Sequence, residues 1–311
     1  MINKEDKSVF AYLKETYLQW QDDQAFRQSA VIAYYSIFSL PALIIIIVTV
    51  AGLFYSTEEI RALINEQIGS ALGEDAATQI QNIVKNSKDH GSSTFAIIIG
   101  IGSLIFGATG LFYQLQQSLN KVWDVEPKPS AGILKIVMDR ALSLGIVLSI
   151  CFLLIVSLVA TTIISAISSW VEQQLADYFL YIFYVVDIVL SVGLVTLFFA
   201  IIYKVLPDVN IPWRTVWVGA LVTALLFVIG EFTLGVYFGK TNPASTFGAA
   251  GSIILVLLWV NYSGLIFLFG AEFTKVYARK NRHKVTVSSH AQRTAEYRFN
   301  RMDKDVVVEG D

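Results

Sequence analysis

Four long stretches without a charged side chain constrain this sequence more than any other feature. They contain 30, 30, 31 and 31 residues and cover 28–57, 91–120, 141–171 and 241–271. A helix crosses the hydrocarbon core of a bilayer with about 20 apolar residues, so each stretch is long enough for one span and too short for two spans joined by a turn. The pattern therefore predicts an integral membrane protein.

Two further apolar segments carry one internal acid each. Residues 178–203 contain Asp187, and residues 215–239 contain Glu231. With these two, the sequence predicts an all-α protein with six transmembrane helices. Their expected positions are about 30–54, 94–116, 137–167, 178–203, 214–239 and 248–274.

The composition and charge support this class and exclude others. Hydrophobic residues make up 55% of the chain and charged residues only 15%, against about 25% charged in a typical soluble domain. The net charge of −2 gives no global basic field that would indicate a nucleic-acid partner. Cys151 is the single cysteine, which excludes an intrachain disulfide and a thiolate metal cluster.

The positions of the basic residues predict the orientation. Of the 23 lysines and arginines, 19 fall on the side of the predicted bundle that holds both termini. Cytoplasmic loops are enriched in Lys and Arg, so both termini are predicted to be cytoplasmic. The expected organisation is a cytoplasmic N-terminal segment 1–29, a transmembrane domain 30–274 and a cytoplasmic basic tail 275–311.

An external insert, 56–93, separates the first two predicted spans. Ser56 and Glu59 have the spacing of a capping box, and apolar residues then recur at helical intervals on both sides of Gly73. Two short amphipathic helices are expected. They either form a lid over an outward opening or pack on the bundle or lipid surface.

The tail begins with a dense group of basic residues. Five of them lie within ten positions: Lys275, Arg279, Lys280, Arg282 and Lys284. Such a group is attracted to anionic lipid of the inner leaflet, and it also satisfies the orientation rule. The rest of the tail is polar, which predicts poor order.

The two acids within the spans are the first candidates for function. An acid at a helix centre costs about 2.5–3.5 kcal/mol on the insertion scale, so it is expected to face the bundle interior or water. Asp187 and Glu231 lie roughly 12–14 Å from the same side at 1.5 Å per residue. They could share a proton or a cation, or each could be protonated or hydrogen-bonded separately.

Other polar residues and several glycines complete the candidate pathway. Asn261 near the middle of the last helix could bridge helices or contact a ligand. Five more candidates fall near the cytoplasmic ends, where they could line a vestibule or anchor the interface: Tyr34, Tyr35, Gln114, Gln117 and Glu272. Small residues that favour close packing of the last two helices are Gly235, Gly239, Gly248 and Gly251.

Signatures of enzymes and of resident cofactors are missing from the sequence. The three histidines, His90, His283 and His290, have no zinc-ligand spacing, so no metal site is expected. The sequence has no GxSxG motif and no Walker A loop, so neither an esterase site nor an ATP site is predicted. We expect no enzymatic activity, no cofactor and no nucleic-acid partner.

Several strings together carry a family resemblance between about residues 10 and 280. They are Ala33–Pro41, Phe106–Gln116 with Leu119, Asn120 and Trp123, Leu206–Asp208, Trp213–Arg214, Trp217–Phe227, Phe247–Ser252, Trp259–Ser263 and Phe269–Thr274. The sequence resembles the YihY/BrkB family of bacterial inner-membrane proteins, once labelled ribonuclease BN. Asn261 stands where family members often have a tyrosine. The resemblance implies a six-helix inner-membrane fold and an association with the cell envelope and with lipid transport.

The functional expectation is an inner-membrane transporter or flippase for an envelope lipid or amphiphile, with membrane lipids as partners. A cation/proton antiporter using Asp187 and Glu231, and a non-transporting envelope scaffold, are the alternatives. A ribonuclease is not favoured, because the basic residues are distributed as orientation signals rather than as a groove. The oligomeric state is left open.

Overall fold

A computed structural model of the chain describes residues 8–37, 62, 78, 110–128, 178–241, 251–295 and 297. Three helices in these ranges are long and apolar enough to cross a membrane: α7 (Tyr178–Val205), α8 (Trp213–Thr241) and α10 (Gly251–Lys280). They confirm the fourth, fifth and sixth predicted helices. The insert 56–93, apart from residues 62 and 78, and the helix expected at 137–167 lie outside the described residues.

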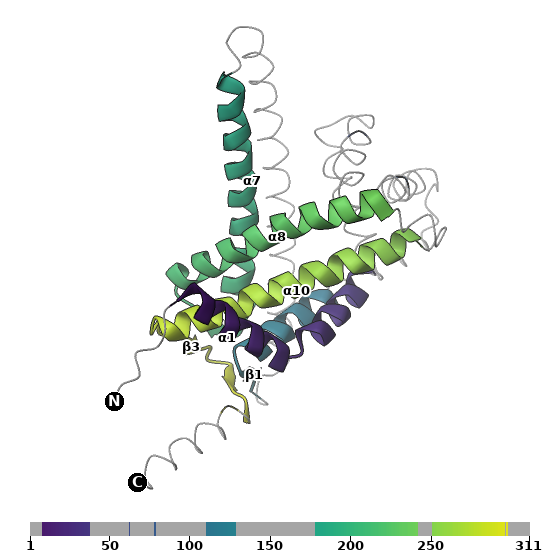
Figure 1. Cartoon of the computed structure of the whole chain (residues 1–311). Helices are drawn as coiled ribbons and strands as arrows, with labels where there is room; N and C mark the ends of the chain where they lie inside the picture. The colour runs from purple at the N-terminus through teal and green to yellow at the C-terminus, as the bar shows by residue number, and fades with distance from the viewer. Residues whose placement is uncertain are drawn as a thin grey trace, which may run out of the picture.

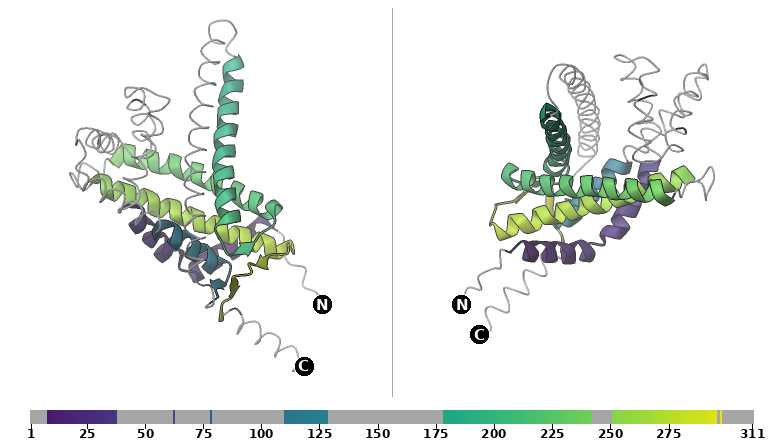
Figure 2. Two further views of the ribbon diagram at one scale, coloured as in Figure 1. Left: turned by 180° about the vertical axis from the view of Figure 1, so that it is seen from behind. Right: turned by 45° about the horizontal axis from the view of Figure 1, so that its top comes forward.

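Helices α8 and α10 lie side by side, and α7 leaves them at a wide angle from a short turn (Figures 1 and 2). Tyr203, near the end of α7, ties the three helices together where they meet. Its hydroxyl donates to the carbonyl of Phe267 on α10 at 2.6 Å and lies 3.0 Å from Thr223 Oγ1 on α8. Because Tyr203 is only 2% exposed, these bonds satisfy a hydroxyl that would otherwise be buried without a partner.

Two glycine–threonine contacts let α8 and α10 approach closely. A Cβ added at Gly219 of α8 would meet Thr274 of α10, and one at Gly270 of α10 would meet Thr223 of α8. Each threonine hydroxyl donates at 2.7 Å to a carbonyl of its own helix, so the interface holds no unpaired hydroxyl at these positions. Close packing of small residues is the usual way in which helices associate within a membrane.

The N-terminal segment contains structure that the sequence analysis did not predict. Helix α1 (Val9–Asp22) is capped by Ser8, whose Oγ accepts from the backbone N–H of Ala11 at 3.2 Å. Gln24, with φ of 54°, turns the chain into a second helix over residues 25–37. This helix begins about five residues before the expected start of the first span, because a left-handed residue rather than a charge boundary sets its start.

The tail is more ordered than its composition suggested. Four short strands form two antiparallel pairs: β1 (Val125–Pro127) with β4 (Ala291–Arg293), and β2 (Val209–Asn210) with β3 (Thr286–Val287). The helix over residues 110–122, which runs past its expected end at 116, leads into β1. The expectation of poor order was wrong for residues 281–295, because backbone pairing with two loops holds this polar segment against the bundle.

Candidate functional site

The most concentrated polar contacts lie where α7, α8, α10 and the tail meet, and Asp208 is at their centre. Asp208, in the turn between α7 and β2, is 4% exposed. One carboxylate oxygen accepts from Asn120 Nδ2 at 2.8 Å, and the other lies 2.8 Å from His290 Nε2. Gln116 Nε2 also reaches Asp208 at 3.5 Å. We call these four residues the Asp208 cluster.

The backbone of Asp208 takes part in the same cluster. Its N–H donates to Asn120 Oδ1 at 2.8 Å, so this amide uses both of its ends on a single residue. Its carbonyl accepts from the N–H of Ser288 at 3.0 Å, next to the β2–β3 pair. The cluster thus fixes the 110–122 helix, the α7–α8 turn and the tail to one another, and a buried carboxylate held in this way is stabilised by the bonds that it accepts.

A second group of charges lies near this end of the bundle and is formed by Asp23, Asp124, Glu272 and Lys275. Glu272 of α10 is 1% exposed, and its carboxyl lies close to that of Asp23, just after α1. Lys275 Nζ forms an ion pair with Asp124 Oδ2 at 2.9 Å. Lys121 Nζ donates to the backbone carbonyl of Asp23 at 2.7 Å and so closes the group. We call the four acidic and basic residues the Glu272 cluster.

The Glu272 cluster has one unusual feature. Among the described residues, Glu272 Oε1 is a buried side-chain oxygen without a hydrogen-bond partner. Two carboxyl groups in contact repel when both are charged and attract when a proton lies between them. The Glu272 cluster therefore places two carboxyl groups close together at one end of the bundle.

Replacing Glu272 with glutamine tests this arrangement. The amide of glutamine can donate to Asp23 without a shared proton, so we expect the free energy of unfolding to stay within about 1 kcal/mol of wild type. Glu272→Ala opens a cavity and is expected to cost about 2–4 kcal/mol. Denaturation by SDS in mixed micelles, followed by tryptophan fluorescence, measures both. If both variants lose the same free energy of unfolding, the contribution of Glu272 to stability comes from its negative charge next to Lys275 rather than from its size or hydrogen bonding.

Glu231 lies in a different place, on one face of α8 with Ala220, Ala224 and Phe227. Spacings of four, seven and eleven residues from Ala220 put all of these positions on the same side of a helix. Both alanines are fully buried, and the Phe227 ring lies 5.8 Å from Phe199 of α7. One turn beyond Phe227 on this face, Glu231 is exposed. The carboxylate therefore follows directly on the part of α8 that packs against α7.

Asp187 belongs to α7, and its side chain is outside the described part of the structure. The two helices that carry Asp187 and Glu231 diverge from their common turn (Figures 1 and 2). The prediction that these two carboxyls share one proton or cation thus stays untested.

The remaining predicted residues are dispersed. Asn261 Nδ2 donates to Ser29 Oγ at 3.2 Å and so links α10 to the 25–37 helix. Gln114 Nε2 donates to Ser118 within its own helix at 3.3 Å, and Gln117 is half-buried on that helix. The rings of Tyr34, which is 58% exposed, and Tyr35 lie 5.6 Å apart. Only Glu272 of the predicted set belongs to a cluster described above.

The packing role expected of four glycines near the ends of the last two helices stays a prediction. Gly235 and Gly239 lie within α8, Gly251 is the first residue of α10, and Gly248 is outside the described residues. Gly219 and Gly270, which have no GxxxG spacing, also approach the neighbouring helix, where each faces a threonine.

Sequence reasoning missed Asp208, Asn120 and His290 as site residues. A signal was present, since Asn120 and Asp208 both lie within the strings that carry the family resemblance. They are 88 positions apart, and a sequence pattern alone does not bring such residues together. His290 was assigned to a polar tail, and the pairing of β3 and β4 carries it to the bundle.

Comparisons with known proteins agree over most of the chain. A family model described as "Virulence factor BrkB" matches residues 16–295. The ribonuclease-like protein YfkH of Bacillus subtilis is 24% identical over 274 residues, 88% of this chain and 97% of that protein. A UPF0761 membrane protein of Psychromonas ingrahamii is 26% identical over 275 residues, 86% and 88% of the two chains. No solved structure matches the chain.

The match includes the elements that build both clusters. It begins within α1 and ends after β4, so it takes in Asp23, Asn120, Asp208, Glu272 and His290. The three membrane-length apolar helices are consistent with the description of the Psychromonas ingrahamii relative as a membrane protein. The chain is a multi-pass membrane protein, consistent with the bacterial inner membrane, and it belongs to the BrkB family.

Proposed function

We propose that this protein is a transporter that moves a lipid or another amphiphile of the cell envelope across the bacterial inner membrane, without an ATP site of its own. The exposed carboxylate of Glu231, one turn beyond the contact of Phe227 with α7, is the observation that carries the proposal. A charge at this depth is costly in hydrocarbon, so it is retained where it meets water or a polar headgroup.

The surroundings of Glu231 fit an amphiphilic cargo. Apolar side chains next to it on α8 are exposed: Val228 by 37%, Ile229 by 62% and Phe232 by 74%. A polar group beside an apolar surface can hold a headgroup while acyl chains stay in the lipid. In this proposal the chain has six spans with both termini cytoplasmic. The basic residues Lys204, Arg214 and Lys275, at or near the ends of α7, α8 and α10 that meet, support that orientation.

Flipping of a fluorescent phospholipid in proteoliposomes tests the proposal. Wild type is expected to flip lipid faster than empty liposomes, and Glu231→Gln is expected to slow it by about tenfold or more, an effect of at least about 1.4 kcal/mol on the barrier. Thr233→Val is the matched control, because Thr233 is also exposed on α8 and its hydroxyl donates to the carbonyl of Ile229 within the same helix at 2.8 Å.

Wild-type flipping equal to that of empty liposomes would contradict transport of phospholipid. Full activity in Glu231→Gln would remove Glu231 from the path while leaving transport in place. Equal slowing by Thr233→Val would indicate a general disturbance of α8. These three results are distinguishable in one series of vesicles with equal amounts of reconstituted protein.

A cation/proton antiporter is the second candidate, and the contact between Glu272 and Asp23 favours it. The same vesicles, loaded with a pH-sensitive dye, test it by cation-dependent proton flux in wild type and Glu272→Gln. A scaffold without transport predicts no flux of either kind. The ribonuclease-like name of the Bacillus subtilis relative makes RNA cleavage an outcome to test, by incubating the purified protein with RNA and Mg²⁺.

A further inference from the structure

Helix α1 has two dissimilar faces, and only one of them is packed against the protein. Trp20 on the packed face is 8% exposed, and its Nε1 donates to the carbonyl of Leu265 on α10 at 3.1 Å. The ring of Tyr12 lies beside those of Phe273 and Tyr277 in a tilted arrangement, each at a centroid distance of 6.2 Å. The packed face of α1 therefore lies against the C-terminal half of α10.

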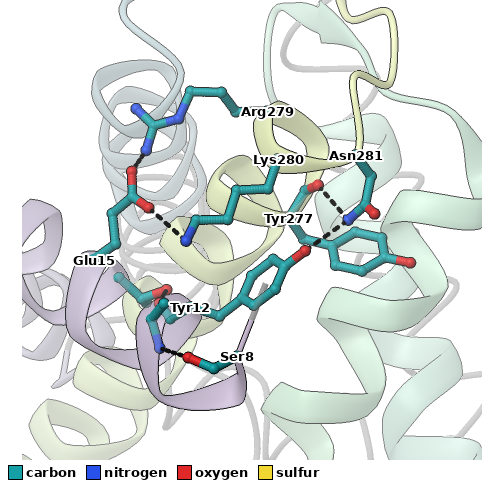
Figure 3. A network of polar contacts seen from close by, with 9 residues as sticks. Ser8, Tyr12, Glu15, Tyr277, Arg279, Lys280 and Asn281 are labelled. Atoms are coloured by element: carbon teal, nitrogen blue, oxygen red, sulfur yellow. Dashed lines mark hydrogen bonds and ion pairs between the residues drawn. The ribbon is translucent and has the colours of Figure 1, made fainter. Parts of the chain in front are cut away.

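A polar network fixes α1 at this position (Figure 3). Glu15 forms ion pairs with Arg279 and with Lys280, the latter at 3.2 Å. Asn281 Nδ2 donates to the hydroxyl of Tyr12 at 3.2 Å. The Lys280 ammonium also lies 4.8 Å from the centre of the Tyr12 ring. Helix α1 is thus held to α10 by several independent contacts rather than by a single one.

The opposite face of α1 is exposed and carries a stripe of apolar side chains beside Lys14 and Gln21. Phe10 is 74% exposed, Leu13 42% and Tyr17 48%, and their spacing of three and four residues places them on one stripe. Val9 and Leu18 flank the stripe with exposures of 74% and 49%. An exposed apolar stripe of this kind on an ordered helix indicates a contact with another apolar phase or molecule.

The position of α1 along α10 indicates that this apolar contact is with the lipid bilayer. The residues of α10 that α1 contacts, from Leu265 to Lys280, all belong to the membrane-length apolar segment Ile253–Lys280. Two residues after α1, the chain enters the 25–37 helix, which α10 contacts through Asn261 and Ser29. A helix packed against the end of a span lies at the depth of that end, so its outward face meets the bilayer rather than bulk water.

We propose that the stripe of Phe10, Leu13 and Tyr17 is a lipid-binding face, seated in the interfacial layer of the leaflet at this end of the bundle. Apolar side chains with a tyrosine among them are typical of helices that lie in this layer. Lys14 and Asp22 are both exposed on α1 and have opposite charges. The contact is therefore with the acyl and glycerol region, and it does not depend on the headgroup charge.

Nitroxide labels in the full-length protein test this face. Cys151, the single cysteine, is replaced by serine, and cysteine is then placed in separate variants at Leu13, Tyr17, Asp22, Lys284 and Leu225. Leu225, 48% exposed on α8, is the lipid reference. Lys284, exposed in the tail, is the water reference, and Asp22 is the matched control on α1. Power-saturation EPR in phosphatidylcholine vesicles compares accessibility to oxygen and to a water-soluble nickel chelate.

Labels in Leu13→Cys and Tyr17→Cys are expected to give an oxygen-to-nickel ratio between those of the Leu225 and Lys284 labels, as the interfacial layer requires. The Asp22 label is expected to resemble Lys284. Adding phosphatidylglycerol is expected to leave these ratios unchanged. A nickel accessibility at Leu13 and Tyr17 equal to that at Lys284 would overturn the proposal in favour of water. Low accessibility to both reagents would overturn it in favour of a protein partner or a second copy. Two stripe positions keep the test valid if one variant fails to fold.

Discussion

Replacing Asp208 with alanine is expected to lower the free energy of unfolding by about 3–5 kcal/mol. The change removes a buried carboxylate that accepts from Asn120, Gln116 and His290. It leaves those donors in a site from which water is largely excluded, since Asn120 is 1% exposed and Gln116 9%. Buried donors without acceptors account for most of the cost. SDS denaturation in mixed micelles gives the value.

Two further variants make this result specific. Asp22→Ala removes an exposed aspartate and is expected to change the free energy of unfolding by less than about 0.5 kcal/mol. A double-mutant cycle between Asp208→Ala and Asn120→Ala is expected to give a coupling energy of about 1–3 kcal/mol, because the two side chains are in direct contact. A loss below about 1 kcal/mol in Asp208→Ala would contradict the view that this cluster holds the end of the bundle together.

Gly270→Ala and Gly193→Ala are expected to change stability in opposite directions. A Cβ at position 270 would lie 2.6 Å from the Tyr203 hydroxyl and would also meet Thr223, so we expect a loss of about 1–3 kcal/mol. A Cβ at position 193 of α7 would meet nothing within 4 Å. There the higher helix propensity of alanine should raise the free energy of unfolding by up to about 1 kcal/mol.

The same SDS titration measures both glycine variants. Because the chemical change is identical, the comparison isolates the approach of α8 to α10 from the effect of adding a methyl group. A higher free energy of unfolding in Gly270→Ala would show that α8 and α10 can move apart to accept the methyl group without losing stability. The packing of Tyr203 between three helices would then contribute little to the stability of the bundle.

The sequence predicted the long helices because the bilayer imposes a simple rule on them. A chain that crosses hydrocarbon satisfies its backbone hydrogen bonds within one helix, so an apolar run of the right length is sufficient evidence. The expected 178–203 and 214–239 agree with α7 and α8 to within about two residues at each end. The expected 248–274 ends before α10 does, because Arg279 and Lys280 extend the helix through their ion pairs with Glu15.

The sequence was less informative about structure outside the apolar runs. Helix α1 has a short and amphipathic pattern, and its apolar residues were overlooked among charges. The tail strands have only two or three residues each, too few for a periodic signal. Their formation depends on the partner strands β1 and β2, which lie far away in the sequence.

By itself, the sequence determined the class of this protein, the positions of three membrane-length helices and its membership of a family, because these follow from local composition and from ordered strings of residues. The tertiary structure alone decided which polar residues meet. It brought His290 to Asp208 and Asp23 close to Glu272, and it left Glu231 exposed one turn beyond the contact of Phe227 with α7. The physical reason is that a buried charge is stabilised by partners from other elements, and only the packing of the helices determines which partners come within hydrogen-bonding distance.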